Sequence, residues 1–129
     1  MMRFLLVLLL LVPIIGLSQR QINLKPKYFG IYKGKIPAFL MDSGKDLLSV
    51  DDSPITIEIR RETIQFTIGS NKKSGEYSVL LEANDYFVLD CKINGQAANE
   101  RIMVFKKGEK ITRDGLFPQP NAKLFKTNN

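Results

Sequence analysis

Apolar residues recur at every second position between residues 54 and 92, and this alternation constrains the fold more than any other feature of the chain. Each of two consecutive runs carries three of them: Ile55, Ile57 and Ile59, then Ile64, Phe66 and Ile68. Successive side chains of a strand point to opposite faces, so such alternation is typical of half-buried β-strands. Two more alternating runs follow before residue 92.

The first two runs predict a hairpin with a defined register. A turn at residues 60–63 sets residue 59 opposite 64, 57 opposite 66 and 55 opposite 68. A slip of one residue would turn Thr and Glu side chains into the buried face, so this register is strongly specified. A second turn at residues 71–74 predicts three further pairs, namely Ile68–Tyr77, Phe66–Val79 and Ile64–Leu81.

The third turn has two possible lengths. A two-residue loop at residues 83–84 would bury the parity of Tyr86, Val88 and Asp90, whereas a three-residue loop at residues 83–85 would bury that of Phe87, Leu89 and Cys91. Burial of an unpaired aspartate costs several kcal/mol. We therefore expect the longer loop, with Cys91 inside as a small hydrophobic residue.

The rest of the mature chain adds further short segments of the same kind. We expect strands at residues 27–32, 36–41, 99–106 and 110–113, with a bend at residues 33–35 and an extended tail from about residue 116 whose Leu124 and Phe125 touch the body. Eight or nine short strands at near-regular spacing predict an all-β domain. The chain is expected to form a single small antiparallel meander shaped as a lipocalin-like barrel, with a two-sheet β-sandwich as the alternative.

The N-terminus has the composition of a secretory signal peptide. Arg3 precedes an apolar run over residues 4–15, and small residues stand at Gly16 and Ser18. This run is shorter than the roughly 20 apolar residues that span a bilayer, so we expect cleavage after Ser18. Residues 19–129 would then form one secreted or periplasmic β-domain with no membrane span.

The charge of the chain does not indicate nucleic-acid binding. The 19 Lys and Arg against 13 Asp and Glu give +6, and the loss of Arg3 with the leader leaves +5. Much of this surplus falls at predicted turns and strand ends, where lysine protects sheet edges. A nucleic-acid site would need a basic face with stacking aromatic residues.

The side chains present exclude several kinds of catalytic site. The chain has no histidine and one cysteine, which excludes Ser-His-Asp and Cys-His centres and thiolate zinc sites. The aspartates at positions 42, 46, 51 and 52 lack the spacing of a calcium loop and fit turn positions. Either Glu100 or Arg101 must point inward if its strand is regular, and we expect that strand end to be solvated. We expect no enzyme, no metal and no cofactor.

The aromatic residues supply the candidate binding surfaces. The expected cavity-lining residues of a barrel are Tyr32, Phe66, Tyr77, Phe87 and Phe105. The same side chains would equally form a filled core. The expected partner patch consists of Tyr86, Val88, Phe117 and Phe125. These sets suggest an exported binding domain that holds an apolar small molecule or, alternatively, a cell-envelope module that binds another protein.

The opening of the domain resembles a known family in pattern. After the leader the chain reads Gly30-Ile31-Tyr32, which is similar to the Gly-x-Trp opening of small lipocalin-like domains of bacterial envelopes. Tyr32 stands where those domains have Trp. The resemblance implies a barrel shape, and it extends to no ligand and no site residue.

Overall fold

The computed structural model describes residues 21–116 and 118–127. The expected signal peptide at residues 1–18 and the expected partner-patch residue Phe117 lie outside these ranges. Within them the chain is all-β apart from a short 3-10 helix, Pro26–Tyr28.

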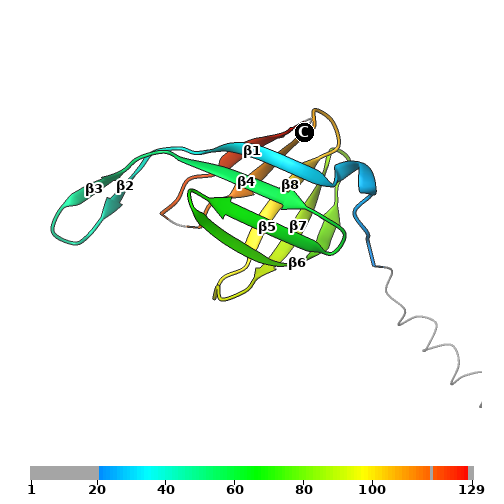
Figure 1. Ribbon diagram of the computed structural model, residues 1–129, viewed down its shortest axis with the longest axis horizontal. Coiled ribbons are helices and arrows are strands. Elements are labelled where there is room, and N and C mark those ends of the chain that lie inside the picture. Colours follow the sequence, from blue (N-terminus) through cyan, green and yellow to red (C-terminus); the bar gives the residue numbers. More distant parts are fainter. Residues whose placement is uncertain (1–20, 117, 128–129) are drawn as a thin grey trace, which may run out of the picture.

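Eight antiparallel strands form a closed barrel, and two more form a separate hairpin (Figure 1). The barrel strands are β1 (Gly30–Ile36), β4 (Ser53–Ile59), β5 (Thr63–Ile68), β6 (Asn71–Glu82), β7 (Tyr86–Ile93), β8 (Glu100–Phe105), β9 (Lys110–Asp114) and β10 (Ala122–Lys126). The hairpin strands are β2 (Phe39–Asp42) and β3 (Leu47–Val50). The prediction of an antiparallel barrel is confirmed, and the sandwich is not formed.

β1 closes the barrel by pairing on both sides. All seven of its residues pair with β4, from Gly30 opposite Ile59 to Ile36 opposite Ser53. Its other edge pairs with β10, where Tyr32 lies opposite Lys126. From β4 to β10 each barrel strand pairs with the next one along the chain.

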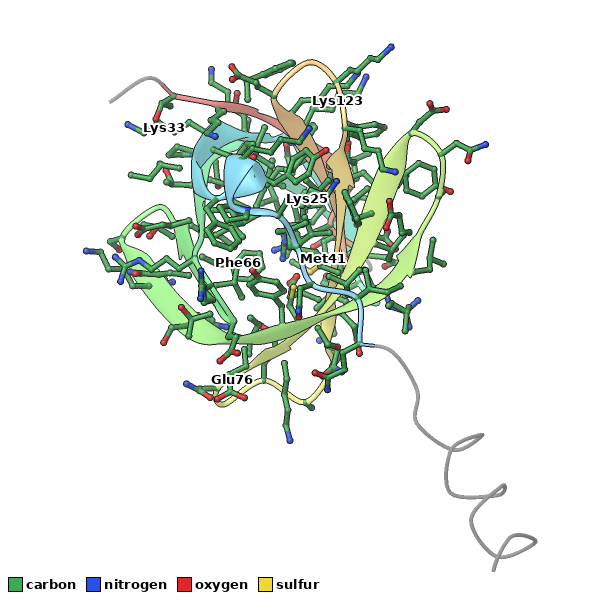
Figure 2. All side chains as sticks on the ribbon, turned by 90° about the vertical axis from the view of Figure 1, so that its right-hand side faces the viewer. Lys25, Lys33, Met41, Phe66, Glu76 and Lys123 are labelled. Atoms are coloured by element: carbon green, nitrogen blue, oxygen red, sulfur yellow. The ribbon has the colours of Figure 1, made fainter. Side chains whose placement is uncertain are left out.

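Inward-facing aliphatic side chains fill the middle of the barrel. Figure 2 looks along the barrel and shows Phe66 inside the ring of strands, with Lys33, Glu76 and Lys123 outside. The buried inward residues of the barrel strands include Tyr32, Ile55, Ile57, Ile59, Ile64, Phe87, Leu89, Cys91, Ile102, Val104, Ile111 and Leu124. An eight-stranded barrel has an interior just wide enough for side chains to fill.

Two of the predicted turns are confirmed. The β4–β5 register pairs Ile59 with Ile64, Ile57 with Phe66 and Ile55 with Ile68. The three-residue loop after β6 is also present, and it buries Phe87, Leu89 and Cys91.

The predicted β5–β6 register is wrong. The turn is the two-residue Gly69-Ser70, so Ile68 pairs with Asn71 and Ile64 with Gly75 instead of with Tyr77 and Leu81. The prediction aligned the apolar residues of the two strands and so placed Tyr77 and Leu81 opposite β5. In the structure β6 is twelve residues long and changes partner at Gly75, before those residues. Residues 71–76 pair with β5 and residues 75–82 pair with β7.

The two ends of the chain also differ from the prediction. The residues expected to form a bend, 33–35, lie inside β1. The glycine at position 34 allows β10 to pass close by, because a Cβ there would be 2.1 Å from the Lys123 carbonyl oxygen. The segment expected to be an extended tail includes β10, with Leu124 fully buried. The expected strand start at Lys27 belongs to the 3-10 helix.

Substitution of Gly75 tests the strand crossing. A Cβ at this position would be 2.0 Å from the Lys92 carbonyl oxygen and 2.8 Å from the Cα of Ile93. Because backbone must move to accept it, we expect Gly75→Ala to lower the free energy of unfolding by about 2–3 kcal/mol. Urea denaturation measures this, and Ser74→Ala on the exposed neighbouring position serves as control. Equal stability of the two variants would contradict the described crossing.

Candidate functional site

The five residues expected to line one cavity occupy four different environments. Tyr32 and Phe87 are fully buried inside the barrel, Phe87 with its ring centroid 5.3 Å from that of Tyr28. The Tyr32 hydroxyl donates to the Tyr28 carbonyl oxygen at 2.8 Å. Tyr77 lies at one end of the barrel and Phe66 at the other. Phe105 stands on the outer surface beside Tyr86, with ring centroids 6.2 Å apart.

A cavity of about 300 Å³ opens at the end of the barrel from which β2 and β3 project. We name it the Arg113 cavity; its apolar wall comprises Phe66, Ile68, Ile93, Leu116 and Pro118, and its polar wall comprises Lys73, Gln96, Glu100, Arg113 and Gln119. The cavity exists because β6 places Gly75 and Lys73 opposite Ile64 and Phe66. Neither residue fills the barrel end as a large apolar side chain would.

A buried ion pair forms part of the polar wall. The Arg113 guanidinium donates from Nε to Glu100 Oε1 and from Nη2 to Glu100 Oε2, both at 3.0 Å. Nη1 donates to Gln119 Oε1 at 2.9 Å. Arg113 and Glu100 are only 4% and 2% exposed. Three of the five N–H groups of the guanidinium thus have partners among the described residues, which leaves one on Nη1 and one on Nη2 available to a ligand.

The expectation of a solvated strand end at Glu100 and Arg101 is wrong. Glu100 points inward and is buried, while Arg101 points outward and lies 3.6 Å from Asp90. The signal that identifies the pair was present in the sequence. In the sequence, Glu100 shares the parity of Ile102 and Arg113 shares that of Ile111. The structure adds the β8–β9 register, which places Ile102 opposite Arg113.

Lys73 gives the cavity a surplus of positive charge. It forms no ion pair with a carboxylate in the part of the chain that the structure describes. Arg113 and Glu100 cancel each other, so the lining carries a net charge of +1. The geometry therefore suits an apolar group against Phe66, Ile68 and Ile93 together with an anionic group near Lys73 and Arg113.

A second, larger hollow of about 880 Å³ lies at the opposite end of the barrel. It separates the segment that precedes β1 from the second half of β6, and we name it the β6 hollow. Its lining includes Ile22, Leu24, Phe29, Val79 and Leu80. The Tyr77 hydroxyl borders it and donates to the Arg60 carbonyl oxygen at 2.6 Å.

The expected partner patch is dispersed on the outer surface. Tyr86 and Val88 are half-buried on β7, whereas Phe125 is exposed on β10, with β8 and β9 between the two strands. Lys110 lies between them: it pairs with Phe125, and its Nζ is 4.8 Å from the centroid of the Phe105 ring. An ammonium group therefore interrupts the aromatic surface.

Cys91 is fully buried in the packed interior. Burial raises the pKa of its thiol to about 12, with smaller contributions from the carboxylates of Glu100 and Asp90. A thiol of this kind stays protonated and unreactive at neutral pH. The geometry assigns Cys91 to the core.

A double-mutant cycle on Glu100 and Arg113 tests the buried pair. Glu100→Leu or Arg113→Met alone leaves an uncompensated buried charge and should cost about 3–5 kcal/mol of unfolding free energy. The double variant removes both charges, so its loss should fall below the sum of the single losses by about 2 kcal/mol or more.

The exposed pair of Glu58 and Arg60, whose Oε1 and Nε are 3.0 Å apart, supplies the matched control. Its Leu and Met variants should show a coupling of less than about 1 kcal/mol in the same urea denaturation experiment. Additive losses at Glu100 and Arg113 would contradict the pairing.

The pH dependence of stability tests the burial of Cys91. The thiol ionises from pH 9.0 upward in the unfolded chain but only near 12 in the folded one, so alkaline pH favours unfolding. The free energy of unfolding should fall between pH 9 and 10 by about 1 kcal/mol more in the wild type than in Cys91→Ala. Above pH 10, Tyr32 adds to the loss, because burial raises its pKa from 10.0 to about 12. Parallel stability curves for the two proteins would refute this assignment.

The described residues contain no group of three or more His, Cys, Asp and Glu side chains that could hold a metal ion. Asp42 stabilises the turn that follows it, since its Oδ1 accepts a hydrogen bond from the Gly44 amide at 2.8 Å. No helix within residues 21–116 and 118–127 has the length and apolar character needed to cross a membrane. No protein family, curated protein or solved structure matches this chain.

Proposed function

We propose that this protein is a binding domain that holds a small amphiphilic anion in the Arg113 cavity. The observation that supports the proposal is the buried Glu100–Arg113 pair beside an apolar wall at the open end of a closed barrel. Binding sites of proteins commonly combine a mostly apolar concave surface with a few oriented polar groups. The sequence predicted an apolar ligand; the ligand proposed here also carries a negative charge.

The polar wall is suited to holding an anion in one orientation. Glu100 and Gln119 fix the plane of the Arg113 guanidinium, so its two remaining N–H groups have set directions. Lys73 adds a second positive charge from β6. A carboxylate that meets both groups would gain charge-assisted hydrogen bonds, which are stronger than neutral ones.

The dimensions of the cavity limit the ligand. The cavity volume of about 300 Å³ is at the small end of the range of roughly 300–1,000 Å³ found for ligand pockets. A small aromatic or branched aliphatic acid matches this volume, whereas a long-chain lipid would have to extend out of the barrel. A binding role is favoured over catalysis, because Glu100 is held in a bidentate pair with Arg113.

We also propose that the domain acts outside the cytoplasm, in a periplasm or in the surrounding medium. The support is the arrangement of Arg3, the apolar run at residues 4–15 and the small residues Gly16 and Ser18. The lipocalin-like character of the barrel belongs to the same proposal. It is supported by the closed antiparallel meander with a site at its open end.

Titration with para-ethylbenzoate and its neutral isostere para-ethylbenzamide tests the site. We expect the carboxylate to bind at one site and to shift the NMR signals of Phe66, Ile68 and Ile93. Lys73→Gln should weaken carboxylate binding by about fivefold, which corresponds to about 1 kcal/mol for one exposed charge, and leave the amide unaffected.

Lys72→Gln is the matched control, because Lys72 adjoins Lys73 but does not line the cavity. It removes the same charge from the same strand. Equal weakening by both variants would reduce the effect to net charge, and the absence of binding by either compound would refute the site.

A further inference from the structure

The hairpin of β2 and β3 exposes large apolar side chains to solvent. It belongs to an arm, residues 37–52, that projects from one end of the barrel (Figure 1). Leu47 and Leu40 are 68% and 64% exposed, and Leu48 and Met41 are also exposed. A two-stranded hairpin is at best marginally stable by itself in water. These side chains therefore suit a surface that covers them.

The arm and the rest of the chain carry opposite charge. The arm has Asp42, Asp46, Asp51 and Asp52 against Lys45, a net charge of −3. The mature chain carries +5 after the loss of Arg3, so the rest of it carries +8. Opposite fields steer association and disfavour contacts between surfaces of like charge. A second copy of this chain presents a body that is basic as a whole and attracts the arm over long range, while the charges that line its β6 hollow balance, Lys25 and Arg61 against Glu62 and Glu76. Two arms repel each other.

The β6 hollow offers a surface that an extended strand can occupy. β5 pairs with β6 only as far as Glu76, so residues 78–82 have no strand partner on that side among the described residues. An unpaired strand edge is a template for an added strand. Exposed Ile22 and Leu80 border this edge, together with half-buried Val79.

The arm cannot reach the hollow of its own molecule. β1 and β4 run between the two features: each ends at the arm on one side and at the lining residue Phe29 or Arg61 on the other. Seven residues of strand span about 20 Å, and the arm points away from the barrel (Figure 1). Any contact between the arm and the hollow must join two molecules.

We propose that copies of this chain associate head to tail, with the arm of one copy paired along the free edge of β6 in the next. Leu40 and Leu47, which share one face of the hairpin, would be buried beside Ile22 and Leu80. An interface of this kind joins two different surfaces, so repetition gives rings or filaments. This association does not depend on the ligand proposed for the Arg113 cavity.

Complementation between two variants tests the proposal. Analytical ultracentrifugation of the purified protein, from cells that express the full chain, should show assemblies that grow with protein concentration and shrink as salt is raised. Leu47→Asp damages the arm and Leu80→Asp damages the hollow, so each variant alone should be monomeric. A mixture of the two should form a one-to-one dimer and nothing larger, because one intact arm and one intact hollow remain.

Phe125→Asp is the matched control, since Phe125 is a large exposed apolar residue remote from both surfaces. It should assemble as the wild type does, and circular dichroism should show that all three variants retain the barrel. A wild type that stays monomeric at all concentrations would overturn the proposal. Self-association of Leu80→Asp would also overturn it, because it would indicate contact between two arms. Binding of the monomer to phosphatidylcholine vesicles through Leu47 would overturn it as well, because it would indicate that a lipid surface covers the arm.

Discussion

The pairing of β1 with both β4 and β10 is the constraint on which the rest of this structure depends. It removes the two free edges that an open eight-stranded sheet would expose, and it seals the aliphatic interior from water. With the sides closed, the interior of the barrel can be reached only through its two ends. The Arg113 cavity occupies one end and the β6 hollow the other, so the closure also determines where a ligand or a partner can bind.

The sequence predicted those parts of the barrel in which apolar pattern and register agree. Three isoleucines in β4 face two isoleucines and Phe66 in β5, and only one alignment places all six on the inner face. The same reasoning failed at β6, where Gly75 and Lys73 occupy inward positions. A glycine needed for close strand approach and a lysine at an open end both interrupt the apolar alternation, although the strand continues. The pattern alone therefore placed the turn too late.

The candidate site was less predictable than the fold, for a related reason. Aromatic residues were expected to line a cavity, yet most of them pack against each other or face outward, and only Phe66 reaches the Arg113 cavity. The residues that characterise the site are charged. The sequence argument treated Glu100 as an isolated charge at a strand end, because its partner Arg113 lies on the next strand. Once a register joins the two strands, burial of both becomes favourable, since each supplies the hydrogen bonds that the other requires.

The partnership of β1 with β10 also has a consequence for how the chain folds. Tyr32 pairs with Lys126, so the contact that completes the barrel joins residues from the two ends of the domain. Contacts of such long sequence separation slow folding, because the loop must close before the pairing stabilises it. During synthesis β10 is the last strand of the barrel to emerge from the ribosome. Until then the chain is an incomplete sheet with open edges, a form in which chains are prone to aggregation and available to chaperones.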